Sequence, residues 1–196
     1  MSMIEVEVKA RASRKETLQK LERDDILKRG TLRFIGTEHQ KDAYFNAPDR
    51  DFGKTDEALR LRTINGTCEL TYKGKRLDGV SKTRPEYNTP ADEYNMTRIL
   101  EALGFYLSGK VEKTRYVYHY SHEMYGDLIF CFDDVSGPGE FLEIEVGLDE
   151  NAGTEEIDKA ADRIFGVMSR LGLSKADSIR SSYLELVMQA ASGKDL

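Results

Sequence analysis

The stretch IEVEVKA at residues 4–10 alternates apolar and charged side chains with a period of two. Successive side chains of a β-strand point to opposite faces, so this period predicts a strand. One face of that strand would carry Glu5, Glu7 and Lys9, and the other would carry only apolar side chains. The strand therefore needs an apolar layer on one side and water or a charged ligand on the other.

The same period of two recurs along most of the chain. Strands are predicted at residues 4–10, 42–46, 58–64, 67–73, 80–88, 112–120, 127–133 and 140–147. Antiparallel strands with short connections can avoid exposed sheet edges by closing on themselves. We therefore predict an α+β fold, a closed eight-stranded antiparallel β-barrel with flanking helices.

Helices are predicted where a small polar residue, able to cap a helix start, precedes an apolar stripe of helical spacing. A capping box of Ser13 and Glu16 starts the first helix, which runs to about Glu22. The other helices are predicted at residues 89–104, at residues 154–172 and from residue 174 onward. Residues 1–191 are expected to form one domain, because no Pro/Gly/Ser-rich linker divides them, and residues 192–196 to form a disordered tail.

Composition and charge argue against several classes of protein. With 33% charged residues and no apolar run of about 18 residues, the chain does not read as a membrane protein. The net charge of −6 argues against nucleic-acid binding, and the first residues lack the pattern of a secretory signal, so we expect a cytoplasmic protein. The two cysteines and three histidines have no zinc-ligand spacing, and no disulfide is implied.

Charged residues are sorted by strand. Paired acids stand on the first and last predicted strands, and paired bases stand on those between them. An antiparallel sheet with one face in water would show the same alternation, but a solvated face usually mixes the two signs. If helices cover the apolar face, the charged face lines the inside of the barrel, where unpaired charges are costly and a highly charged ligand is needed.

A polyphosphate with divalent cations would satisfy both signs of charge. Carboxylates are the ligands that Mg²⁺ and Mn²⁺ prefer. The predicted metal ligands are Glu5, Glu7, Asp133, Glu143 and Glu145. Lysine and arginine neutralise phosphate oxygens. The predicted phosphate-binding residues are Arg60, Arg62, Lys73, Arg84, Lys113 and Arg115. Lys175 and Arg180 are interpreted as solvated helix charges, although they could reach an open end of the barrel.

Ordered motifs along the chain resemble those of the CYTH superfamily, the triphosphate tunnel enzymes. They are ExExK at residues 5–9, DAYFN at 42–46, DEALRLR at 56–62, LTYKG at 70–74, KTRPEY at 82–87, EKTR at 112–115, FDDVSGPGEFLEIE at 132–145 and SYLELV at 182–187. The resemblance implies an eight-stranded antiparallel tunnel in which the matching acids coordinate Mg²⁺ or Mn²⁺. The matching bases, Lys9 among them, would hold a triphosphate, and Lys9 and Arg60 become the candidate catalytic residues.

Three functions stay open at this point. The stretch at residues 39–62 resembles most the class IV adenylyl cyclases, which implies conversion of ATP to cyclic AMP and pyrophosphate. A triphosphatase would use the same parts to direct water at tripolyphosphate, thiamine triphosphate or a nucleotide. A non-catalytic module would bind polyphosphate without turnover. The expected partner is a small-molecule triphosphate, with no nucleic acid and no membrane, and a homodimer is compatible with the sequence.

Overall fold

The computed structural model describes residues 3–75, 85–149 and 151–193. Its strands are β1 (Met3–Arg11), β2 (Thr31–Asn46), β3 (Ala58–Ile64), β4 (Thr67–Lys73), β5 (Glu86–Ala91), β6 (Tyr106–His122), β7 (Gly126–Val135) and β8 (Gly139–Asp149). Its helices are α1 (Arg14–Arg23), α2 (Phe52–Thr55), α3 (Glu93–Ala102), α4 (Thr154–Arg170) and α5 (Tyr183–Ala191), with 3₁₀ turns η1 (Leu27–Arg29) and η2 (Lys175–Asp177). Much of the strand predicted at 80–88, and residues 194–196 of the expected tail, lie outside the described residues.

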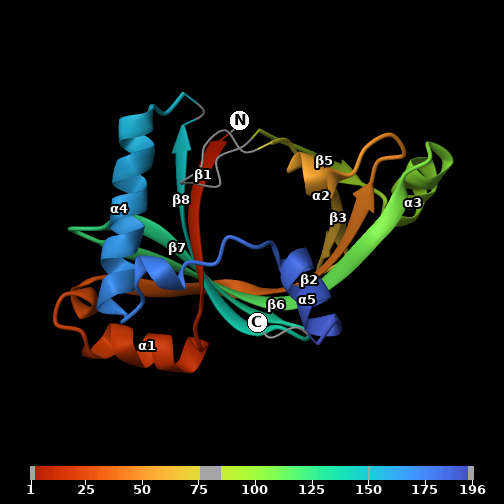
Figure 1. Cartoon of the computed structure of the whole chain (residues 1–196). Helices are drawn as coiled ribbons and strands as arrows, with labels where there is room; N and C mark the ends of the chain where they lie inside the picture. Colours follow the sequence, from red (N-terminus) through yellow and green to blue (C-terminus); the bar gives the residue numbers. More distant parts are fainter. Residues whose placement is uncertain (1–2, 76–84, 150, 194–196) are drawn as a thin grey trace.

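These strands form one antiparallel sheet with the order β1-β8-β7-β6-β2-β3-β4-β5. The sheet curls around a central space (Figure 1). Its two outermost strands, β1 and β5, are not hydrogen-bonded to each other within the ranges that the structure describes. The α+β fold with eight antiparallel strands is confirmed. The ladder takes the form of a curled half-barrel, and no pairing of described strands closes it into a ring.

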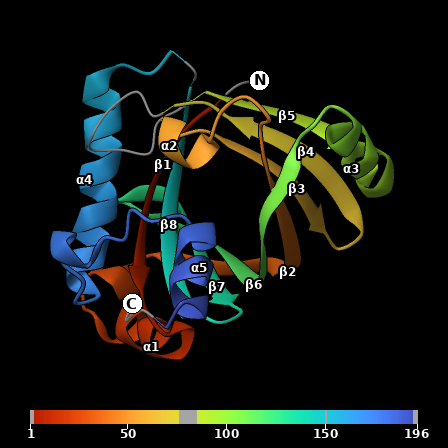
Figure 2. The ribbon, with the colours of Figure 1, turned by 45° about the vertical axis from the view of Figure 1, so that its right-hand side comes forward.

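The longest pairing joins β2 and β6, which both extend well beyond the predicted strands. It runs from Thr31 opposite Ser121 to Asn46 opposite Tyr106, with register shifts at two points. Such irregularities bend a strand and increase its twist. The bent ladder connects the two walls of the half-barrel, so that β1 and β8 face β3 and β4 across the central space (Figure 2).

Helices cover the outer, apolar face of the sheet. Leu21 of α1 and Ile164 of α4 pack against the apolar side chains of β1 and β8 in one core cluster. Phe52 of α2 and Leu100 of α3 pack against β2 and β3 in a second cluster. Because neighbouring residues on a strand alternate, this outer burial turns the charged residues of β1 toward the concave side.

The C-terminal helix α5 packs from the concave side, where Figures 1 and 2 both show it beside the strands. Tyr183 and Leu186 contact a cluster that includes Val111, Val135 and Phe141 on three neighbouring strands. These three apolar residues each precede or follow a charged residue of the concave face by two positions. The apolar cluster therefore occupies one end of the concave face and leaves the charged residues around the rest.

Two predicted helix starts need correction. Ser13 is the N-cap residue of α1, but its side chain makes no capping hydrogen bond, so the predicted capping box with Glu16 is not formed. α3 does not start at Thr89, because Thr89 and Pro90 continue β5 and pair with β4. The helix begins after Asp92, whose carboxylate accepts a hydrogen bond of 2.8 Å from the backbone N–H of Asn95.

The last helix also starts later than predicted. Ser174 caps only the short turn η2. Ser182 caps α5, and Glu185 completes a capping box by accepting from the backbone N–H of Ser182 at 2.6 Å. Both serines fit the sequence signal for a helix start, and the one that begins a long helix is followed by the apolar residues of the SYLELV motif.

We predict that Ile164→Ala lowers the free energy of unfolding by about 2–5 kcal/mol, because Ile164 is fully buried between α4 and the sheet and its truncation leaves a cavity. Urea denaturation measures the change. Ile99→Ala is the matched control, since Ile99 is 51% exposed on α3, and we expect a loss of less than about 1 kcal/mol. Equal losses in the two variants would contradict the assignment of the core.

Candidate functional site

A polar cavity of about 280 Å³ lies on the concave face of the half-barrel. Its lining comprises Glu5, Glu7, Lys9, Arg60, Arg62, Glu69, Lys73, Glu86, Asn88, Lys113, Arg115, Glu143, Glu145, Arg180, Ser182 and Tyr183. This set contains every site residue predicted from the sequence except Asp133, which is buried beneath it, and Arg84, which lies outside the described residues. Segments far apart in the sequence therefore meet in one charged cavity.

Three carboxylates gather where β1 meets β8. Oxygen atoms of Glu5, Glu7 and Glu145 all lie within 4.8 Å of one another. The strand register explains the cluster, because Glu7 is directly opposite Glu145 and Glu5 is two residues away on the same face. Oxygen ligands at this spacing could hold a divalent cation such as Mg²⁺ or Mn²⁺.

The pKa values of the cluster reflect loss of solvent around its carboxylates and, to a smaller extent, repulsion between them. Desolvation on the concave face, followed by the neighbouring Glu7 carboxylate, raises the pKa of Glu5, even though this residue is exposed at the open cavity. Burial also holds the pKa of Glu145 well above its usual range, although the Arg115 guanidinium acts in the opposite direction. Ionising both groups is therefore costly unless a cation binds between them.

The remaining two predicted metal ligands contact Arg115. Arg115 donates from Nε to Oδ1 of Asp133 at 2.7 Å and from Nη2 to Oδ2 at 2.6 Å. It also donates from Nη1 to Glu145 at 3.2 Å and from Nη2 to Glu143. The Arg115 pKa stays well above its usual value, because the nearby carboxylates outweigh the cost of burial.

Asp133 is the most enclosed of the five predicted metal ligands. Besides Arg115, its Oδ2 accepts from Nζ of Lys113 at 2.8 Å and from the Tyr183 hydroxyl at 2.7 Å. Burial opposes ionisation of Asp133, but Lys113 and Arg115 bring its pKa below the usual value. Asp133 thus lies apart from the Glu5, Glu7 and Glu145 cluster and holds the cations beside the cavity.

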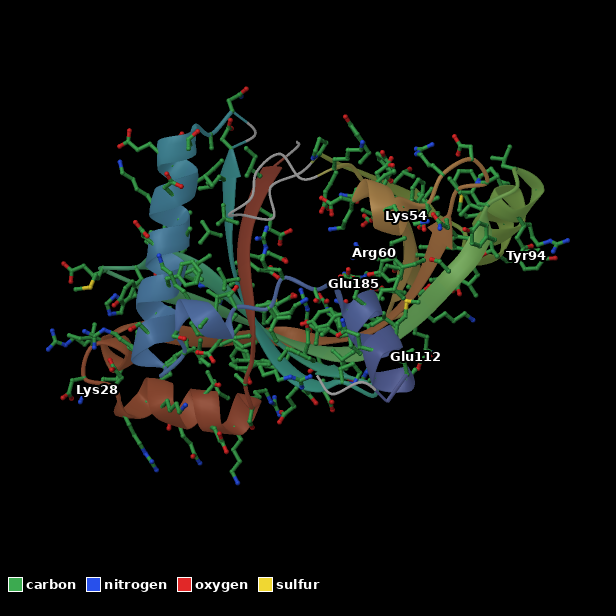
Figure 3. All side chains as sticks on the ribbon, in the orientation of Figure 1. Lys28, Lys54, Arg60, Tyr94, Glu112 and Glu185 are labelled. Atoms are coloured by element: carbon green, nitrogen blue, oxygen red, sulfur yellow. The ribbon has the colours of Figure 1, made fainter. Side chains whose placement is uncertain are left out.

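The opposite wall of the cavity carries cations from β3 and β4. Arg62 donates from Nε and Nη2 to the two oxygens of Asp42 at 2.6 and 2.7 Å. Lys73 forms an ion pair with Glu86. Arg60 points from β3 toward the central space (Figure 3), and its buried Nε has no hydrogen-bond partner among the described residues. Because this nitrogen is closed off from solvent, a phosphate in the cavity could reach it only after the Arg60 side chain turned.

Sequence reasoning missed several residues of the site. In the sequence Asp42 is visible only as part of the DAYFN motif, because its pairing with Arg62 depends on the register between β2 and β3. Tyr183 belongs to the SYLELV motif, yet nothing in its spacing shows that α5 packs from the concave side. Arg180, interpreted as a solvated charge, is exposed and also lines the cavity. Lys175 lies over the Phe165 ring instead, 4.9 Å from its centroid.

Together these features define a class of α+β protein, an antiparallel half-barrel with outer helices and a cavity of mixed charge. The sequence profile of the CYTH domain matches residues 3–183, and the chain belongs to this family. Its members are adenylyl cyclase-like or triphosphatase enzymes and generally depend on a divalent metal. None of the helices in the described part of the chain is long and apolar enough to cross a membrane.

Individual relatives agree with this assignment. The chain is 38% identical over 185 residues to a protein of Methanocaldococcus jannaschii provisionally named an adenylate cyclase, and the match covers 94% of this chain and 98% of the relative. A solved structure from Pyrococcus horikoshii OT3 is 35% identical, with a TM-score of 0.75 over 94% of this chain and 98% of that one. A protein of Hippeastrum, described as having a dominant triphosphatase activity, shares the fold at 19% identity and a TM-score of 0.62, over 100% of this chain and 98% of that one.

The raised pKa values of Glu5 and Glu145 predict an unusual pH dependence of stability. The folded state binds these protons more tightly than the unfolded chain does, so this contribution to the free energy of unfolding falls as pH rises above the ordinary glutamate value of about 4.3. Glu145→Gln should therefore be stabilised relative to the wild type, and the difference should grow with pH. Urea denaturation between pH 5 and 8 in the presence of EDTA measures it.

The control for this experiment is Glu123→Gln, which changes an exposed glutamate outside the cavity. We expect its stability to follow the wild type at every pH. Saturating Mg²⁺ should reduce the difference between the wild type and Glu145→Gln, because a cation bound only to the folded state stabilises the wild type. A stability difference that is constant over this pH range would contradict the raised pKa of Glu145.

Proposed function

We propose that the chain is a divalent-metal-dependent enzyme that acts on a triphosphate bound in the concave cavity. The observation that carries the proposal is that one cavity holds a carboxylate cluster on β1 and β8 and, on the facing strands β3 and β4, the cations Arg60, Arg62 and Lys73. Glu5, Glu7 and Glu145 suit a hard divalent cation, while Arg60, Arg62 and Lys73 suit phosphate oxygens. A triphosphate with its metal is a ligand that uses both halves.

The proposed metal site is the Glu5, Glu7 and Glu145 cluster, with Glu143 close by on the same face of β8. A bound Mg²⁺ or Mn²⁺ would neutralise phosphate charge and polarise a phosphoryl oxygen. Asp133 would then not bind the metal itself, and would instead keep Lys113 and Arg115 in position beside the phosphates. Its metal role, predicted from the sequence, is the weaker alternative, because Lys113, Arg115 and Tyr183 already donate to it.

The cations of the cavity would bind and orient the triphosphate. Asp42 fixes the orientation of Arg62, so that this guanidinium loses little rotational freedom on binding. Arg60 lines the cavity, and we assign it to the phosphate group on which charge develops during reaction. Lys9, whose side chain is 2% exposed and whose Nζ lies 3.8 Å from Glu143, would orient the attacking oxygen. Arg84 remains a proposed phosphate ligand.

Adenylyl cyclase chemistry is the first candidate for the reaction. In that reaction the ribose 3′-oxygen of ATP bonds to the α-phosphorus, the bond from that phosphorus to the bridging oxygen breaks, and pyrophosphate leaves. The support comes from the 38% identity with the M. jannaschii protein, which extends over nearly the whole of both chains. Cations at Arg60, Arg62 and Lys73 would stabilise the departing pyrophosphate.

A triphosphatase is the second candidate, and the lining of the cavity favours it. Among the described lining residues, Tyr183 is the one aromatic side chain, and two lysines lie over its ring. Tripolyphosphate needs no aromatic platform, whereas a bound adenine commonly uses one. Water would then attack a terminal phosphorus in place of the ribose oxygen, with the same metal and cation residues in use.

We predict that Glu5→Gln and Glu145→Gln each reduce turnover at least about 100-fold, because each removes a charged ligand from the cluster while keeping the side-chain shape. Steady-state rates in Mg²⁺ and Mn²⁺ measure the effect, and thermal melting checks the fold. Glu112→Gln is the control, since Glu112 is exposed, adjoins Lys113 and lies on the opposite face of β6. Full activity in both cluster variants would refute the metal assignment.

The reaction itself is tested by product analysis with ATP and, separately, tripolyphosphate in Mg²⁺ or Mn²⁺. We expect cyclic AMP and pyrophosphate from ATP, and chromatography identifies both. Orthophosphate from tripolyphosphate, with no cyclic AMP from ATP, would establish the triphosphatase instead. Tight metal-assisted binding of either compound without any product would leave a binding module and overturn both enzyme assignments.

A further inference from the structure

Tyr183, the first residue of α5, reaches into the charged cavity and contacts three of its ionised groups. Its ring lies under two ammonium groups, with Nζ of Lys9 4.0 Å and Nζ of Lys113 4.4 Å from the ring centroid. Its hydroxyl donates to Oδ2 of Asp133 at 2.7 Å. Although it is 7% exposed, Tyr183 lines the cavity, so α5 contributes directly to the environment of the proposed triphosphate.

Carboxylates hold the two lysines to different degrees. Both side chains are 2% exposed; Nζ of Lys113 donates to Asp133 at 2.8 Å, and Nζ of Lys9 lies 3.8 Å from Glu143. A buried carboxylate competes with a phosphate for the N–H groups of an ammonium. An aromatic face attracts the cation without accepting a conventional hydrogen bond, so the Tyr183 ring adds an attractive contact to each ammonium without using one of its N–H donors.

The Tyr183 hydroxyl also affects how strongly Asp133 attracts the Lys113 ammonium. Oδ2 of Asp133 accepts from Lys113, from Arg115 and from Tyr183. Each donor satisfies part of the carboxylate charge, so the tyrosine weakens the hold of Asp133 on the Lys113 ammonium. The ring and the hydroxyl therefore have the same consequence for Lys113.

The first turn of α5 keeps the tyrosine in place. Ser182 and Glu185 form the capping box at the start of the helix. The Tyr183 ring packs edge-on against Phe141, with centroids 5.4 Å apart, and Leu186 lies in the same apolar cluster. A ring that is already held by packing against Phe141 can position flexible side chains at little additional entropic cost.

We propose that Tyr183 is a positioning residue that keeps the ammonium groups of Lys9 and Lys113 directed toward the triphosphate. This inference rests on the proposed function of the cavity. It assigns a substrate-positioning role to α5, an element that carries neither the carboxylate cluster nor the cation wall.

The test compares Tyr183→Leu, which removes the ring and the hydroxyl, with Tyr183→Phe, which removes the hydroxyl alone. We expect Tyr183→Leu to raise the Kd for metal-free tripolyphosphate roughly 10-fold, and Tyr183→Phe roughly 3-fold, since two cation–π contacts and one hydrogen bond are involved. KM should rise by similar factors, with a smaller change in kcat. Mn²⁺ binding in the absence of phosphate should be unchanged, because Tyr183 does not contact the carboxylate cluster. Calorimetry and steady-state kinetics give these values.

Tyr125→Leu and Tyr125→Phe are the matched controls. Tyr125 is 8% exposed beneath α4, and its hydroxyl accepts from Nε of Arg170 at 3.1 Å, so it loses similar contacts outside the cavity. We expect both control variants to lose stability in thermal melting while keeping the wild-type Kd and KM. A loss of affinity that follows stability in all four variants would show a structural role alone and would overturn the proposal.

Failure of this inference is distinguishable from failure of the proposed function. A wild-type protein that binds no tripolyphosphate, with or without Mg²⁺, refutes the function and with it the basis of the inference. A wild type that binds tripolyphosphate, together with a folded Tyr183→Leu of equal Kd and KM, refutes only the role of Tyr183. If Tyr183→Leu does not fold, Tyr183→Phe decides, and an unchanged Kd in that variant overturns the proposal.

Discussion

The interior of the half-barrel depends on the contacts of one guanidinium group. Arg115 on β6 meets Asp133 on β7 and both Glu143 and Glu145 on β8, while its own side chain is 12% exposed. Carboxylates this close would repel one another and remain poorly solvated without a cation among them. A planar group with five N–H donors can serve all three, which a lysine at the same place could not do. The neighbouring strands β6, β7 and β8 are thus held together by charge on their concave face and by apolar packing on their outer face.

These two faces also specify the strand register. A shift of one residue along β1 would bring Glu5, Glu7 and Lys9 under α4 and expose Val6 and Val8 to the cavity. Both exchanges are unfavourable, so the register is specified from each side independently. The cluster at Glu5 and Glu145 is the exception, because it brings carboxylates within 4.8 Å of one another, and desolvation together with their repulsion raises the pKa of both residues. Such local instability is typical of a binding site, where the ligand supplies the missing charge.

Alternation along single strands made much of the fold, and the grouping of most candidate site residues on one face, predictable from the sequence. It identified the strands and placed Glu5, Arg60 and Glu145 on one face of the sheet. Contacts between side chains on different strands are harder to predict from the sequence. The pairing of Asp42 with Arg62 and the enclosure of Asp133 depend on register and on a helix far along the chain.

Local signals also competed with each other. Thr89-Pro90 reads as a helix start, but pairing of β5 with β4 extends the strand through both residues, and Asp92 takes over the cap. Ser174 and Ser182 carry equivalent capping signals, and only tertiary packing of α5 decides which one begins a long helix. Strand closure could not be judged from periodicity either, since a curled open sheet and a closed barrel have the same alternation of side chains.

The proposed metal and phosphate sites cannot be independent, because Arg115 contacts groups of both. A phosphate oxygen bound by Arg115 would compete with Glu143 and Glu145 for the same N–H donors. Carboxylates released in this way regain acceptor capacity beside the Glu5 and Glu7 oxygens, where a divalent cation can use it. By linkage, a metal that draws Glu145 toward the cluster would in turn free Arg115 for phosphate. Triphosphate and metal would then each favour the binding of the other, in a cyclase and in a triphosphatase alike. The two reactions would therefore share this coupling and differ in which phosphorus is attacked and by which oxygen.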